Sequence, residues 1–549
     1  MSIPSSNGVT ISQEIDSIER KIDEYPLKNP IMKQPLQFSL WNVLSAHEHY
    51  CYSPLQDGGT ARDFTICFDH AKYALKYAFN WLHENARAMG SFSVPKKLKD
   101  ARMREAVDLF TSALEYEGIV NAFTVYRRDG AKYEMRGKRA VRFLRDKTEA
   151  RYDVLDRQVF EAPEPISQPT AETLEVKEVL HRAANSALRT NENTLRFSLT
   201  ESDYRILSNH ISKNSDRSFL FPKGWHFQGI SIETFRLVWV ALKCFYETYR
   251  FCFLRSTSLS PTEARYSPLV IHVQPIECIV KTLHSYIPCV EKDMLAKIMG
   301  LLTYNRTTHK PDPALQPLIP LRDALVGVAP HLVVSSRFER NTITLLSRSY
   351  KDEYDKTTGL LEDDLLCELG KGVAGLGFDV VTRISFPQDM KLPDLDLSIF
   401  DRHDNIVLLV EVKWVIQPSE VSETYSRAAT ESKGIEQVTK LLNYGRKNPS
   451  QFWERLFPNR NRPTNVRLCG CVCMRGFVGT ARNFTKDAPT IEQSVFCAKL
   501  REVGNLKKLI TWMEGREFLP VEDRDFRILE LPHRVGPYTV YWPSYELLS

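Results

Sequence analysis

The sequence lacks the features that mark several common classes of protein. It has no Cys-x-x-Cys pair and no HExxH motif, and its 13 histidines show no metal-ligand spacing, so a zinc site is not favoured. It has no run of about eighteen apolar residues, and its N-terminus has no basic segment followed by an apolar core. We therefore expect no membrane association and a cytoplasmic location, in which the 11 scattered cysteines stay reduced.

A strong net charge is also lacking, because 73 Lys and Arg face 68 Asp and Glu, which leaves +5. The whole chain therefore does not indicate a polyanionic partner, and only a local patch does so. Residues 127–151 hold such an excess of basic side chains, and we expect a β-hairpin there with its turn at Asp129-Gly130. Either this segment is a solvated face or it contacts nucleic-acid phosphates through Arg127, Arg128, Lys138, Arg139 and Arg142.

What is present is the composition of an ordinary globular protein, and 549 residues predict two to four domains. Proline-rich stretches at 160–170 and 309–320 indicate linkers or domain edges. We expect mostly helical regions at 1–158 and 171–308, because their apolar residues recur at helical spacing. Region 330–549 alternates helical and strand patterns, which predicts an α/β domain with a mixed central sheet flanked by helices.

Two strands joined by a short polar turn are predicted within LPDLDLSIFDRHDNIVLLVEVKW, residues 392–414. Because strand side chains alternate, Asp394 and Asp396 share one face of the first strand, and Glu411 and Lys413 share one face of the second. The second strand is otherwise almost wholly apolar, so its charges would be buried and would need partners or a metal ion. A solvent-exposed pair at a strand end is the alternative.

These charged groups suit one kind of chemistry. Carboxylates and a backbone carbonyl are hard oxygen ligands for Mg²⁺ or Mn²⁺, which polarise a phosphoryl oxygen and lower the pKa of a bound water. Lys413 would then orient that water or stabilise charge that develops on the phosphate. The pattern predicts metal-assisted phosphodiester hydrolysis.

The same residues resemble the motif of the PD-(D/E)XK nuclease superfamily, which has the restriction-endonuclease-like fold. The resemblance covers about residues 360–450, where Pro393-Asp394 precedes Glu411-Val412-Lys413 as the E-x-K element. It implies a metal ion bound by Glu411, by the carbonyl of Val412 and by an aspartate.

Two aspartates compete for that role. The Pro-Asp dipeptide favours Asp394, whereas the acid-apolar-Asp pattern that leads to Asp401 favours Asp396. Both share a face, so one would bind the metal ion while the other supports it.

Two flanking helices add residues to this resemblance. Glu362 lies on the apolar stripe of the preceding helix, where members of the superfamily often carry an acid; a helix N-terminal glutamate favoured by the dipole is the alternative. Gln437 lies on the following helix, which in related nucleases often offers Gln, Lys or Tyr. Tyr444 follows seven residues later, which departs from the four-residue spacing of one exonuclease-like branch.

The resemblance implies a Mg²⁺-dependent nuclease, and we expect a DNA endonuclease of microbial restriction or antiviral defence. The helical regions would serve recognition, control or assembly, with a second copy or a partner subunit. The alternatives are a nucleic-acid-binding or scaffold protein with a degenerate nuclease fold, and a nuclease that acts on RNA or transposon ends.

Overall fold

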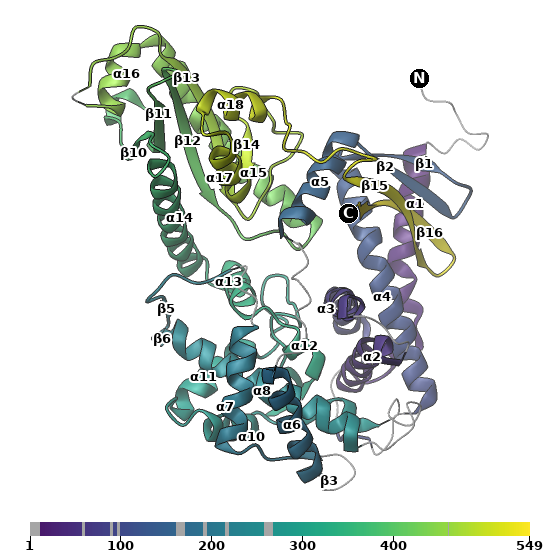
Figure 1. Cartoon of the computed structure of the whole chain (residues 1–549). Coiled ribbons are helices and arrows are strands. Elements are labelled where there is room, and N and C mark those ends of the chain that lie inside the picture. Colours follow the sequence, from purple (N-terminus) through teal and green to yellow (C-terminus); the bar gives the residue numbers. More distant parts are fainter. Residues whose placement is uncertain are drawn as a thin grey trace.

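The structure, a computed structural model, describes residues 11–56, 61–87, 92–95, 99–160, 171–189, 195–214, 219–256, 267–458 and 460–548. The protein is a mixed α/β molecule in which a helical body carries two larger sheets (Figure 1). No helix in these ranges is long and apolar enough to cross a membrane.

The first region is helical, and its helices pack around Trp41, Phe79 and Phe110, which are almost fully buried. Helices α2, α3 and α4 contact one another along their lengths. The elements are α1 (Ile11–Glu24), η1 (Pro26–Lys28), η2 (Pro30–Lys33), α2 (Leu36–Gln56), α3 (Ala61–Asn85), α4 (Asp100–Arg127) and α5 (Lys147–Phe160).

The middle region is also mostly helical and is built around α8, whose Trp239 and Tyr246 lie in the core. Its helices are α6 (Ala171–Ser186), α7 (Glu201–Lys213), α8 (Ile232–Ser256), α10 (Ile276–Tyr286) and α11 (Lys292–Leu302). Its short strands and turn are β3 (Leu188–Arg189), β4 (Leu195–Arg196), β5 (His226–Phe227), β6 (Ile230–Ser231) and η3 (Pro268–Val270).

The second proline-rich stretch is not a linker, so that prediction is wrong. Leu318 and Ile319 are fully buried, and β8 (Ile319–Arg322) pairs with β9 (Leu325–Val328), which pairs with β7 (His272–Pro275). The buried leucine and isoleucine anchor the prolines to the body. The first stretch lies outside the described residues after Phe160.

The sheet that holds the predicted motif has the order β10-β11-β12-β13-β14. β10, β11 and β12 pair antiparallel, whereas β13 and β14 are added in parallel, so the sheet is mixed. β12 and β13 are parallel because the chain between them crosses over the sheet as helices. The strands are β10 (Asp379–Ile384), β11 (Leu395–Asp401), β12 (Ile406–Trp414), β13 (Arg467–Arg475) and β14 (Thr490–Glu492).

Helices cover both faces of this sheet. Leu365 and Leu369 of α14 (Lys351–Ala374) pack with Leu408 and Val410, in the cluster that also includes Phe496 of α17 (Gln493–Val503) and Leu509 of α18 (Leu506–Glu514). On the opposite face, α15 (Val421–Lys447) and α16 (Pro449–Leu456) pack against Val407 and Leu409. The expected flanking of a mixed sheet by helices is therefore confirmed.

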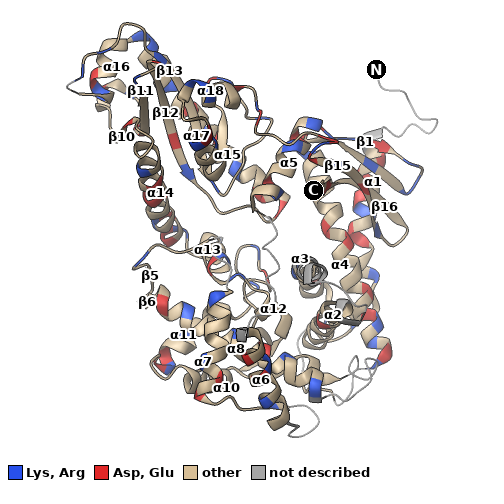
Figure 2. Ribbon diagram, in the orientation of Figure 1, with Lys and Arg blue, Asp and Glu red and all other residues tan. Residues whose placement is uncertain are grey.

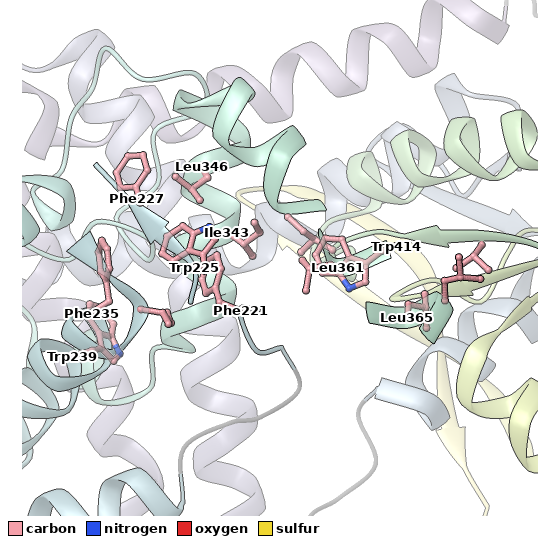
Figure 3. Close-up of a cluster of buried hydrophobic side chains, with 14 of the residues drawn as sticks. Phe221, Trp225, Phe227, Phe235, Trp239, Ile343, Leu346, Leu361, Leu365 and Trp414 are labelled. Carbon is pink, nitrogen blue, oxygen red and sulfur yellow. The ribbon is translucent and has the colours of Figure 1, made fainter. Parts of the chain in front are cut away.

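The sheet unit is continuous with the helical body through one hydrophobic cluster (Figure 3). Trp225 and Phe221 stack at 4.0 Å between ring centroids, and Trp225 donates a hydrogen bond to Thr357 of α14. The cluster then runs through Leu361 to Trp414 at the end of β12. The remaining elements of this part are α12 (Pro330–Val334), α13 (Phe338–Ser349) and η4 (Gln388–Met390).

The other large sheet has four strands, in the order β1-β2-β16-β15, and it joins distant parts of the chain. β16 (Tyr538–Leu547) runs parallel to β2 (Ala140–Arg145), beside β1 (Ala131–Met135) and β15 (Phe526–Val535). The sequence-based region 330–549 therefore does not keep its last two strands in its own sheet. Burial of Val141 and Val540 against each other's strands explains the pairing.

The basic hairpin also differs from the prediction, because its turn lies at residues 136–139. Asp129-Gly130 instead ends α4, where Asp129 has a φ of 56° and the Gly130 N–H bonds to the carbonyl of Val125. A residue in the left-handed conformation directly after a helix closes the last turn of that helix. The same Asp-Gly dipeptide is also typical of a hairpin turn, so the sequence does not distinguish the two.

Candidate active site

Strands β11 and β12 bring two carboxylates close together. Leu397 pairs with Val410 at the end of the antiparallel register, and Asp396 and Glu411 are the residues next to this pair; the charge of Asp396 acts on Glu411. The backbone N–H of Val412 donates a 2.8 Å hydrogen bond to Asp396 Oδ2. The predicted grouping of these strand residues at one place follows directly from this register.

Glu411 is the most deeply buried member of the group, with 2% of its side chain exposed. Its Oε1 lies 2.6 Å from Nζ of Lys413, and its Oε2 has no hydrogen-bond partner among the described residues. Burial, reinforced by the charge of Asp396, raises the pKa of Glu411 to about 7. One lysine therefore does not balance the carboxylates at this point.

Glu362 joins the group from α14. It accepts a 3.3 Å hydrogen bond from the backbone N–H of Trp414, at the end of β12. Burial raises the pKa of Glu362, and Lys413 opposes that shift. Its place on the apolar stripe of α14 thus points it at the site and away from bulk solvent.

The structure separates the two candidate aspartates. Asp394 lies before β11 and is exposed, whereas Asp396 is half-buried within the strand. Burial raises the pKa of Asp396, and the Val412 N–H and Lys413 oppose that shift. Asp396 is therefore the aspartate positioned beside Glu411, and Asp394 acts on it only as a neighbouring charge.

Helix α15 approaches Glu411 through Gly434. A Cβ added at Gly434 would lie in ordinary contact with Glu411 Cγ, at 3.7 Å, but only 3.0 Å from Val472, which would have to shift slightly. Gln437 follows one turn later, and its Oε1 is buried without a partner among the described residues. Tyr444 points elsewhere, because its hydroxyl donates to Gln451.

The donor set fits a magnesium-like ion better than a closed metal cage. Within the described ranges, no three His, Cys, Asp or Glu side chains are gathered as a complete metal centre. Mg²⁺ retains several waters and needs only one or two carboxylates, so Asp396 and the unpaired Oε2 of Glu411 meet its requirement. The Val412 carbonyl stays a predicted third ligand.

The basic segment lies in a part of the molecule that carries both basic and acidic residues (Figure 2), and some of its charges are paired. Arg127 pairs with Asp16 and Glu19 of α1, and Arg142 pairs with Glu530 of β15. The excess counted along the sequence is thus offset by acids from distant segments.

The other three basic residues have different surroundings. Arg128 lies over the ring of Tyr425 in α15 at 4.7 Å, which links this segment to the sheet unit. Lys138 and Arg139 are exposed in the β1–β2 turn. Contact of these residues with nucleic acid stays a prediction.

Three residues beside the carboxylates escaped the sequence analysis. Lys356 and Asp363 of α14 line a cleft together with Asp396, and Arg383 of β10 pairs with Asp363 at 2.5 Å. Single charged residues in a helix and an edge strand carry no motif, so no sequence signal identified them.

The protein matches no family model, no curated protein and no solved structure.

Proposed function

We propose that this protein is a Mg²⁺-dependent nuclease that hydrolyses phosphodiester bonds in DNA, with a catalytic unit of the restriction-endonuclease-like type. The observation that carries the proposal is the buried Glu411, whose Oε2 has no partner among the described residues and which lies near the charge of Asp396. A buried carboxylate oxygen without a partner is costly unless it serves a ligand.

Each residue has a distinct part in the proposed reaction. Asp396 and Glu411 would hold the ion, which supplies Lewis-acid stabilisation and an activated water when bound. Lys413, fixed by Glu411 at 2.6 Å, would hold the attacking water or stabilise the charge on the phosphate. Glu362 would keep the end of β12 in place through Trp414.

Control by the helical regions suits a restriction or antiviral-defence nuclease, and the loop after the motif supports this part of the proposal. Lys76 of α3 pairs with Glu420 at 2.5 Å, and Arg340 of α13 donates a 2.9 Å hydrogen bond to the Gln417 carbonyl. Both helices therefore hold the segment that directly follows Lys413. A change in the helical body would reach the site through it.

The test is a cleavage panel with Mg²⁺ or Mn²⁺ on linear, circular and single-stranded DNA and on RNA. Glu411→Gln and Lys413→Ala should each lower the cleavage rate at least about a hundredfold, because each removes a charge that acts in the transition state. Glu436→Gln, an exposed change on α15 that pairs only with Lys440, is the matched control and should cut normally.

Undiminished cutting by both variants would rule out the assigned site. DNA binding without cleavage by the wild-type protein under every metal condition would instead favour the degenerate, binding-only alternative. Cleavage of RNA alone would keep the site and change the substrate.

A further inference from the structure

A cleft of about 350 Å³ opens beside the carboxylates. Asp396 and Val412 line its sheet side, and residues of α14 line the other, among them Lys356, Gly359 and Asp363. The cleft leads directly to the proposed metal ligands, so a substrate strand that reaches them would lie in it.

Arg383 reaches this cleft through Asp363, which is one of its lining residues. It belongs to β10, the edge strand, and the register places it opposite Asp396, because its neighbours Thr382 and Ile384 pair with Leu397 and Leu395. Its guanidinium Nη2 lies 2.5 Å from Asp363 Oδ1. A long cationic side chain is therefore held between the strand edge and the cleft wall.

The backbone of Arg383 is unusual for this position. Its φ is 55°, in the left-handed region that residues with a Cβ rarely adopt within a strand. Such conformations persist where the surroundings impose them, and they gather at binding and catalytic sites. The conformation takes residue 383 out of the regular ladder and brings its side chain to Asp363.

In the ion pair between Arg383 and Asp363, a phosphate can take the place of the carboxylate. Their side chains are 63% and 55% exposed, and exposed ion pairs contribute little to stability. A guanidinium binds a phosphate through two parallel hydrogen bonds, as it binds a carboxylate. A phosphodiester can therefore replace Asp363 without a large loss.

The negative charge of the cleft creates the need for such a residue. Glu362, Asp363 and Asp396 all line it, and together they would repel a nucleic-acid backbone. Lys356 lies on the same wall, but it is 71% exposed and pairs with Glu353. Arg383 brings a second cation to this cleft from the strand edge, through its pair with Asp363 of the cleft lining.

We propose that Arg383 binds a backbone phosphate of DNA next to the bond that is cut, and that Asp363 holds its guanidinium ready until the phosphate displaces it. This assignment rests on the proposed nuclease function and names the residue that positions its substrate.

The first experiment measures DNA binding by the full chain carrying Glu411→Gln, with a labelled duplex and its single strand, across a series of salt concentrations. Adding Arg383→Ala should weaken binding roughly three- to tenfold and reduce the salt slope by about one, as expected for one lost phosphate contact. Arg402→Ala is the matched control, because Arg402 is 68% exposed, pairs with Asp379 and lies at the other end of β10 and β11. It should leave affinity and slope unchanged.

The second experiment tests the part assigned to Asp363. Asp363→Asn should tighten binding, because it frees the guanidinium. Asp379→Asn, which makes the same change of charge at an aspartate paired with Arg402 and Arg460, should leave binding unchanged. The gain should vanish when Asp363→Asn is combined with Arg383→Ala. A gain that persists without Arg383 would show a general charge effect and would overturn the exchange.

A third pair of variants tests whether the strand occupies the cleft. Gly359→Phe should fill the cleft and raise KM for DNA, whereas Gly372→Phe, on the same helix but outside the cleft lining, should leave KM unchanged, because a Cβ at either glycine meets no atom within 4 Å. Equal KM values for the two variants would place the substrate elsewhere.

The outcomes separate this inference from the proposed function. If wild-type protein cuts DNA and Arg383→Ala behaves like Arg402→Ala, the inference is wrong and the nuclease function stands. If wild-type protein neither binds nor cuts DNA, both are overturned.

Discussion

At the scale of single residues, burial makes carboxylates sensitive to their surroundings. Glu411 and Asp396 show this at the proposed site, where burial raises both pKa values. Glu117 of α4 shows it far from the chemistry, because burial and the nearby charge of Glu420 raise its pKa to about 8, and Lys76 only partly opposes the shift. Glu117 therefore offers a test of the same physics without the site.

Glu117 should make folding stability depend on pH. Its pKa in the folded protein, about 8, lies above the value of 4.5 that it has in an unfolded chain, so its contribution is most favourable below pH 4.5 and is lost as pH rises through 8. Glu117→Gln should raise the melting temperature at pH 8 and leave it nearly unchanged at pH 4.5, measured by thermal denaturation. Asp108→Asn, an exposed change on the same helix, should shift neither value; equal shifts would show that burial of Glu117 is not the cause.

The face of the sheet on which a side chain lies could be predicted where the alternation of side chains along a strand decides it. Alternation placed Glu411 and Lys413 on the same face as Leu409 and placed Leu408 and Val410 on the other, and the packing of Leu408 and Val410 against α14 agrees with this. Parity could not choose between Asp394 and Asp396, since they share a face. That choice depends on where β11 begins, which strand pairing determines and local sequence does not.

At the scale of elements, close contact between α15 and β13 depends on small residues. An added Cβ at Gly470 of β13 would overlap Val438 and crowd Leu442 of α15. Glycine at this position therefore sets the distance at which α15 covers the sheet and, through Gly434, its distance from Glu411.

Gly470→Ala should lower the free energy of unfolding by about 1–3 kcal/mol, because the extra methyl overpacks a filled interface. Chemical denaturation monitored by circular dichroism measures the change. Gly372→Ala in α14 is the matched variant, because a Cβ there meets nothing within 4 Å; it should stabilise the helix by up to about 1 kcal/mol. A neutral Gly470→Ala would mean that the helix can move away from the sheet at no cost.

Long elements with a clear period were predictable, and local turn signals were less so. The 3.6-residue pattern of α14 and the apolar run of β12 are strong because each buries a continuous surface. The hairpin turn predicted at Asp129-Gly130 was wrong, because the same dipeptide occurs both at helix ends and in hairpin turns. The burial of Leu318 in a proline-rich stretch depends on distant partners, which composition does not reveal.

At the scale of the whole molecule, β15 and β16 tie the sheet unit back to the N-terminal helices. Val540 is fully buried and Trp542 packs on Phe143 of β2, with 6.2 Å between ring centroids. Pairing between strands that are far apart in the sequence leaves no local sequence pattern. The predicted domain boundary at residue 330 therefore assigned β15 and β16 to the wrong sheet.

Deletion of residues 526–548 should expose Val141 and Phe143, at a cost of roughly 1.5–3 kcal/mol for each side chain. We expect limited proteolysis to cut within residues 131–145 of the shortened chain and to spare the intact one. A full-length chain with Leu529→Ser and Leu531→Ser, both exposed on β15, should resist the protease as the wild type does. Resistance of the shortened chain would show that β1 and β2 are stable alone.

The parallel pairing of β2 with β16 also has a consequence for synthesis on the ribosome. β2 is translated before the five-stranded sheet β10–β14 and β16 after it, so the sheet of β1, β2, β15 and β16 stays half-built until the five-stranded sheet has emerged. A chain interrupted during translation would carry an unpaired strand edge at β2, which is a feature that quality-control proteases and chaperones recognise. Completion of the four-stranded sheet therefore reports that the five-stranded sheet has been made in full.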